Sequence, residues 1–89
     1  MIKTSVTISN KLGLHARASA KLTKLAGSFP CEVWLGRGDR RVNAKSIMGV
    51  MMLAAGIGVT VELETNGERE QEALDAILGL MNDKFGEGE

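Results

Sequence analysis

The spacing of apolar residues changes period several times along this 89-residue chain, and that change is what most constrains its fold. Between Ile2 and Ile8, apolar or β-branched residues alternate with polar ones, which indicates a strand with one buried face. From Ala16 the spacing becomes that of an amphipathic helix, which Gly27 and Pro30 are expected to end. The first third of the chain therefore predicts a strand followed by a helix.

The remaining segments repeat this change of period. Residues 31–43 alternate around a glycine-containing turn, which is typical of a hairpin, and residues 58–65 alternate again as a strand. Ser46 precedes a short apolar run and suits a helix N-cap. A longer helix is expected between Asn66, a candidate cap, and Gly86. The predicted order is β-α-β-β-α-β-α.

This order predicts the fold class α+β, an open-faced β-sandwich. Four alternating strands are expected to form an antiparallel sheet with three helices on one face and solvent on the other. A chain of this length falls within the range of one domain, so residues 1–89 are expected to form a single domain. The last four residues, Gly-Glu-Gly-Glu, suggest a frayed and solvated end.

Composition excludes several functional classes. The formal net charge is zero, whereas a general nucleic-acid binder needs a basic excess. A single cysteine, Cys31, excludes an internal disulfide and a four-thiolate zinc site, and no metal site is predicted. No segment approaches the roughly 18–20 apolar residues of a membrane span, and the N-terminus lacks a signal core. We expect a cytoplasmic protein without membrane insertion.

The only histidine, His15, lies where the strand pattern gives way to the helix pattern, in the stretch NKLGLHARAS. The first amides of a helix lack intrahelical partners and attract anions, and Arg17 adds a guanidinium two residues later. A histidine in this place could accept a phosphoryl group covalently. The alternative is an exposed polar residue or a cap. A serine triad is excluded, because its base would have to be this same histidine and no serine nucleophile for it is identified.

Two segments together resemble the HPr family, the histidine-containing phosphocarrier proteins of the bacterial phosphoenolpyruvate-dependent phosphotransferase system. GLHARAS, at residues 13–19, is similar to the family's phosphohistidine motif, and residues 43–58 are similar to its regulatory serine segment. The resemblance extends from Ile2 to about Phe85. It implies that His15 takes phosphate on Nδ1 from phosphorylated enzyme I and passes it to an enzyme IIA domain, while Arg17 contacts the phosphoryl group.

The resemblance also implies regulation and docking. Ser46 would be phosphorylated by an HPr kinase/phosphorylase, and the added charge would act on docking more than on stability. The family's docking surface falls on six positions of this chain: Ala20, Lys21, Lys24, Ile47, Met48 and Met51. The family commonly has proline where this chain has Ala18, a change expected to have small effects in a first helical turn.

The sequence therefore predicts a phosphoryl carrier that is a protein substrate and not an enzyme, with no cofactor and a monomeric state. One alternative is a mainly regulatory HPr-like protein, acting in a nitrogen-related or incomplete phosphotransferase system through phosphorylation-dependent docking. A small enzyme using His15 as a general base lacks a second catalytic group in the sequence. The basic cluster of Arg37, Arg40 and Arg41 is interpreted as a solvated hairpin tip.

Overall fold

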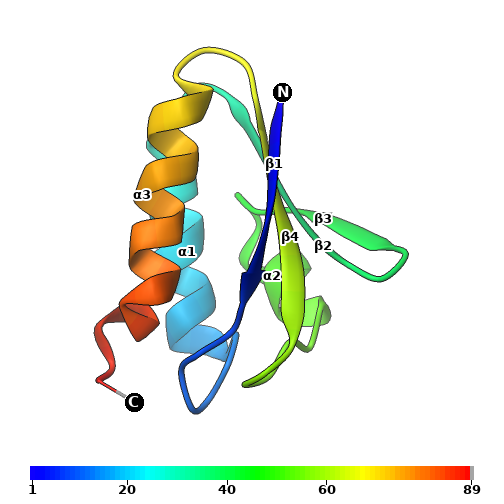
Figure 1. Ribbon diagram of the computed structural model, residues 1–89, viewed down its shortest axis with the longest axis vertical. Helices are drawn as coiled ribbons and strands as arrows, with labels where there is room; N and C mark the ends of the chain where they lie inside the picture. The colour runs from blue at the N-terminus through cyan, green and yellow to red at the C-terminus, as the bar shows by residue number, and fades with distance from the viewer. Residues whose placement is uncertain (89) are drawn as a thin grey trace.

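The computed structural model describes residues 1–88 and has the predicted order of elements. The elements are β1 (Ile2–Thr7), α1 (Ala16–Gly27), β2 (Glu32–Arg37), β3 (Arg40–Asn43), α2 (Ile47–Met52), β4 (Thr60–Asn66), α3 (Glu70–Asn82) and the 3₁₀ turn η1 (Lys84–Gly86). Figure 1 shows α1 and α3 standing together on one side of the sheet. The open-faced β-sandwich is confirmed.

The sheet is antiparallel throughout, with the strand order β1-β4-β2-β3. Its registers place apolar residues opposite each other, as in the pairs Val6 with Val61 and Leu35 with Leu63. All four of these side chains are buried beneath the helices, because alternate residues of a strand point to the same face. Lys3 remains exposed on the other face of the sheet.

The start of α3 differs from the sequence prediction. Asn66 is the last residue of β4 and does not cap the helix. The N-cap is Arg69, which has a left-handed backbone (φ 64°) and no side-chain capping bond. The helix ends at Asn82, four residues before Gly86, and the chain then turns back through η1. The prediction at Asn66 is wrong because strand pairing with β2 extends to Asn66, opposite Glu32.

The arginines at the hairpin tip between β2 and β3 make contacts that the sequence does not predict. Arg37 donates to the carbonyl oxygens of Leu53 and Ala54 at 2.9 and 2.8 Å, and Arg40 donates to that of Met52 at 2.9 Å. These carbonyls lie at the end of α2, where a helix has no intrahelical donors left. Both arginines are exposed, as expected for a solvated tip, and they also hold the C-terminal end of α2 against the hairpin.

Candidate functional site

His15 is the N-cap residue of α1, as predicted. Its backbone is extended (φ −73°, ψ 178°), and its carbonyl accepts the first intrahelical bond, from the amide of Ser19 at 2.8 Å. The imidazole makes no capping bond to the helix. The side chain of His15 is 27% exposed, so the ring lies at the surface and is available for a contact of another kind.

The loop before His15 is held by close backbone packing. Gly13 has a left-handed backbone (φ 63°), and a Cβ at this position would lie 2.5 Å from the carbonyl oxygen of Ala55. The same carbonyl accepts a hydrogen bond from the amide of Leu14 at 2.9 Å. Only glycine fits this approach. The loop that carries His15 is therefore anchored to the segment after α2.

The first turn of α1 is anchored on its inner face. Ala18 is fully buried, and the buried hydroxyl of Ser19 donates to the carbonyl oxygen of Leu14 at 3.0 Å. Ala18 lies in the first turn as expected, a place where proline is tolerated as well. The backbone around His15 therefore has little freedom to move away from the helix axis.

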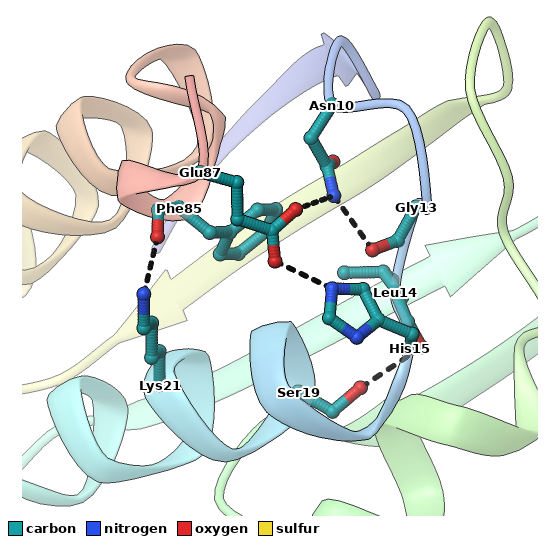
Figure 2. A network of polar contacts seen from close by, with 8 residues as sticks. All are labelled: Asn10, Gly13, Leu14, His15, Ser19, Lys21, Phe85 and Glu87. Carbon is teal, nitrogen blue, oxygen red and sulfur yellow. Dashed lines mark hydrogen bonds and ion pairs between the residues drawn. The ribbon is translucent and has the colours of Figure 1, made fainter. Parts of the chain in front are cut away.

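The imidazole contacts a carboxylate from the other end of the chain, as Figure 2 shows. His15 Nε2 lies 2.5 Å from Glu87 Oε2, and Asn10 Nδ2 donates to Glu87 Oε1 at 3.1 Å. Asn10 is fully buried and also donates to the carbonyl oxygen of Gly13 at 2.8 Å. The predicted solvated end is therefore wrong at Glu87, whose side chain is only 13% exposed.

Hydrogen bonding keeps the Glu87 carboxyl ionised. Burial alone raises the pKa of Glu87, but the hydrogen bonds from Asn10 and His15, together with the nearby charge of Lys21, outweigh it. The pKa of Glu87 is therefore lowered from its ordinary value. An ionised carboxylate only accepts hydrogen bonds, so it pairs with the protonated Nε2 of the ring.

Arg17 is exposed and lies beside His15. Both residues line an open depression of about 790 Å³, together with Lys11, Leu12, Ala16, Lys21, Gly86 and Glu87. Cationic side chains therefore predominate around the ring, and Glu87 is the acidic residue of this lining. The predicted proximity of Arg17 to His15 is confirmed, whereas its contact with a phosphoryl group stays a prediction.

Ser46 is the N-cap residue of α2, as predicted from the sequence. Its backbone is extended (φ −114°, ψ 117°), and its hydroxyl oxygen accepts a hydrogen bond from the amide of Gly49 at 3.2 Å. Ser46 is also exposed, so its hydroxyl is within reach of a modifying enzyme. Capping explains the serine fully by itself, and its regulatory role stays a prediction.

Helix α2 presents an apolar surface, called here the α2 patch, that consists of Ile47, Met48, Met51 and Met52. Their exposed fractions are 43%, 70%, 39% and 65%. The predicted exposure of Ile47, Met48 and Met51 is confirmed, and Met52 was missed. Three predicted docking residues on the neighbouring α1 are exposed as well: Ala20, Lys21 and Lys24. Their role in docking is untested.

Residues 1–88 contain neither a candidate metal cluster nor a helix that could span a membrane. No three histidine, cysteine, aspartate or glutamate side chains in this range lie close enough together to hold a metal ion. No helix in the same range has the length and apolar character needed to cross a membrane. Cys31 is buried and has no disulfide partner.

Comparison with known proteins identifies the class of protein that this fold and this histidine define, a histidine phosphocarrier. The family model described as "PTS HPr component phosphorylation site" matches residues 2–83. A phosphocarrier protein HPr from Cupriavidus necator is 66% identical over 89 residues, with both chains covered completely. The chain belongs to the HPr family, the phosphocarrier proteins of the phosphotransferase system.

Two further relatives widen the comparison. A phosphocarrier protein NPr from Shewanella violacea is 44% identical over 86 residues, covering 97% of this chain and 94% of the relative. The crystal structure of HPr-C-His from Thermoanaerobacter tengcongensis superposes with a TM-score of 0.94 at 41% identity, covering 98% of both chains. The family thus includes relatives with two different names, HPr and NPr.

Proposed function

We propose that this protein accepts a phosphoryl group on Nδ1 of His15 from phosphorylated enzyme I and passes it to an enzyme IIA domain. The observation that carries the proposal is the different environment of the two ring nitrogens. Nε2 contacts Glu87, whereas Nδ1 has no hydrogen-bond partner within residues 1–88 and lies on the side of the ring away from Glu87 (Figure 2). Nδ1 is therefore the nitrogen available to attack phosphorus.

The surroundings of His15 suit the charge of the phosphorylated product. The amides of Ala16, Arg17 and Ala18 precede the first intrahelical bond and give the start of α1 a partial positive charge. The Arg17 guanidinium offers a planar set of donors that matches phosphate oxygens. Because Arg17 is exposed, this stabilisation is moderate, as a carrier that must release its phosphoryl group requires.

Docking of the partners is assigned to the α2 patch and the exposed face of α1. Methionine side chains adapt their shape, so an exposed methionine surface suits a protein that binds several partners at one place. Lys21 and Lys24 are exposed on α1, the helix that packs against α2, and would steer partners with acidic rims. Ala20, also exposed on α1, would supply a small contact.

Phosphorylation of Ser46 by an HPr kinase/phosphorylase would regulate this docking. A phosphoserine carries about −1.5 to −2 charges at neutral pH and would lie directly beside the α2 patch. The start of a helix tolerates that charge. An acidic partner would be repelled, so the modification would weaken docking without unfolding α2.

The remaining features of the proposal follow from the carrier role. The protein is a substrate of enzyme I and not an enzyme, and the transfer needs no cofactor bound to this chain. Residues 1–89 act as one domain, as a cytoplasmic monomer with transient partners. A mainly regulatory role in a nitrogen-related branch is the second candidate, and the relative named NPr is the observation that favours it.

Incubation with enzyme I and radiolabelled phosphoenolpyruvate tests the carrier role. We expect one acid-labile label per chain in the natural protein and none in His15→Ala. Ser46→Ala serves as the matched control, because it removes the other proposed phosphorylation site and should retain the label. An unlabelled natural protein, or a labelled His15→Ala variant, would overturn the proposal.

Partner binding distinguishes the two candidate functions. Phosphoryl transfer from the labelled protein to an enzyme IIA domain of the sugar branch supports the favoured function. Transfer only to the IIA domain of a nitrogen-related system, with no transfer to a sugar-branch domain, supports the second candidate. Both arms use the same labelled protein, so the comparison depends only on the acceptor.

A further inference from the structure

The C-terminal segment is held against α1 by specific contacts. Lys84, Phe85 and Gly86 all have positive φ angles, of 54°, 55° and 75°. The Phe85 side chain is buried, and its carbonyl oxygen accepts a hydrogen bond from Lys21 Nζ at 2.6 Å. Two consecutive residues other than glycine in the left-handed region are unusual, and such strain persists only where the surroundings enforce it. This turn places Glu87 at His15.

Both carboxylate oxygens of Glu87 are used. One oxygen accepts from the fully buried Asn10, and the other contacts His15 Nε2. Asn10 also fixes the carbonyl of Gly13, so one side chain ties together the His15 loop and the carboxylate (Figure 2). The contacts with Asn10 and His15 therefore fix the position of the carboxylate relative to the ring.

A carboxylate on one nitrogen of an imidazole determines which nitrogen carries the proton. An ionised carboxylate has no proton to donate, so the nitrogen facing it must be N–H. The other nitrogen of a neutral ring then carries the lone pair. In this protein the N–H is assigned to Nε2 and the lone pair to Nδ1.

We propose that Glu87 is a positioning residue for phosphoryl transfer: it holds His15 in the Nε2–H tautomer and balances the charge of the phosphorylated ring. This inference rests on the proposed function and adds to it a residue that acts through His15. Glu87 itself touches neither donor nor acceptor. Its effect is comparable to that of a carboxylate that orients a catalytic histidine through the other ring nitrogen.

Transfer of the phosphoryl group to Nδ1 requires no proton to move. The lone pair of Nδ1 forms a bond to phosphorus, and the bond between phosphorus and the leaving atom of phosphorylated enzyme I breaks, its electron pair remaining on enzyme I. Nε2 keeps its proton, so the ring becomes cationic and is paired with the Glu87 carboxylate. In the second transfer the nucleophile of the acceptor forms a bond to phosphorus as the Nδ1–phosphorus bond breaks, and the electron pair of the broken bond returns to the ring. A cationic ring is the better leaving group.

The variant Glu87→Gln tests this role with almost no change of shape. In Glu87→Gln the amide oxygen accepts from Asn10 as the carboxylate does, so the amide NH2 faces Nε2 and pairs with the opposite tautomer, in which Nδ1 carries the proton. Glu68→Gln is the matched control, because it removes the same carboxylate at an exposed position before α3, away from His15. Circular dichroism of both variants verifies that they are folded.

Nitrogen-15 NMR of the His15 ring gives the first measurement, at a pH at which the ring is neutral. We expect the Nε2–H tautomer alone in the natural protein and in Glu68→Gln, and a shift to the Nδ1–H tautomer in Glu87→Gln. The rate of labelling by enzyme I gives the second measurement, and Glu87→Gln should lower it about 10-fold, as loss of an orienting partner commonly does.

The two measurements separate the possible outcomes. An unchanged tautomer in Glu87→Gln overturns the inference, whatever happens to the rate, because the tail would then act only as packing. A changed tautomer with an unchanged labelling rate overturns it as well. If the natural protein takes no label, the proposed function fails, whereas the NMR measurement still reports whether Glu87 fixes the ring.

Discussion

The starts of α1 and α2 are alike in backbone and different in what their N-cap side chains do. His15 and Ser46 both have extended backbones that lead into a helix. Ser46 accepts a hydrogen bond from the amide of Gly49, so its side chain stabilises its own helix. His15 makes no such bond and instead contacts Glu87, 72 positions away in the sequence. A side chain that does not cap its helix is available for chemistry.

The support for the two helices differs in the same way. The loop before His15 is held by buried contacts with distant segments, through Gly13, Leu14 and Asn10. Helix α2 is six residues long, and its end is held by Arg37 and Arg40 from the hairpin. A reacting group gains from a rigid surrounding, whereas a docking surface gains from side chains that adapt to several partners.

The largest effect on stability is expected at the support of His15. Asn10→Ala removes the donor to two acceptors, the Gly13 carbonyl and Glu87, inside a fully buried site. The free energy of unfolding should fall by about 1–3 kcal/mol, measured by urea denaturation. Asn82→Ala, at the exposed end of α3, is the control and should change it by less than about 0.5 kcal/mol. Equal effects at the two positions would contradict this account of the His15 loop.

The next effect compares the two N-caps directly. Ser46→Ala removes the capping bond to Gly49 and should lower the free energy of unfolding by about 1 kcal/mol. His15→Ala removes no capping bond and should lower it by less than Ser46→Ala does, although it abolishes labelling by enzyme I. Thermal or urea unfolding of both variants checks the order. If His15→Ala proves the more destabilising change, the contact of His15 with Glu87 contributes more to stability than the capping bond of Ser46 does.

The sequence predicts the parts of this comparison that are local. The change from strand to helix spacing locates His15 at a helix start, and a serine before an apolar run locates the cap at Ser46. Exposure of methionines on α2 follows from the fact that a six-residue helix has only one buried face, where Val50 lies. Each of these features depends on residues that are neighbours in the chain.

The sequence does not predict the contacts that depend on distant turns. Glu87 reaches His15 because Lys84 and Phe85 adopt left-handed backbones, which their residue types disfavour. The burial of Phe85 enforces that turn. No pattern in the neighbouring residues predicts the turn. The arginines of the hairpin likewise find the end of α2 only after the sheet and the helix have packed. The composition of the chain end therefore predicts a solvated segment, although Glu87 within it contacts His15.

A smaller effect on stability, with a larger effect on docking, is expected when charge is added to the cap of α2. Aspartate, asparagine and serine are nearly equal N-caps, so Ser46→Asp and Ser46→Asn should each change the free energy of unfolding by less than about 0.5 kcal/mol. Only Ser46→Asp should slow labelling by enzyme I, by about tenfold, which corresponds to about 1.4 kcal/mol. Equal slowing by the uncharged Ser46→Asn would show that shape, and not charge, governs docking at α2.

The smallest effect is the pH dependence of stability that Glu87 contributes. Burial raises the pKa of Glu87, but its bonds from Asn10 and His15 lower it further than burial raises it. Because the folded protein holds this proton less tightly than the unfolded chain does, Glu87 adds stability above the ordinary carboxyl pKa. That stability is lost as the pH falls through the lowered value. Glu87→Gln should therefore give a shallower loss of stability in acid, measured by urea unfolding at a series of pH values.

Glu72 is the exposed carboxylate with which Glu87 is compared in this measurement. The hydrogen bond and the charge of Arg69 lower the pKa of Glu72 too. In dilute buffer, Glu72→Gln should therefore also reduce the loss of unfolding free energy as the pH falls. The Glu72 side chain is 63% exposed, however, whereas that of Glu87 is 13% exposed. In roughly 1 M salt, where the Debye length is about 3 Å, the effect of Glu72→Gln should largely disappear. That of Glu87→Gln should persist, because salt screens an enclosed pair less. Loss of both effects in salt would mean that Glu87 is as solvated as an ordinary surface carboxylate.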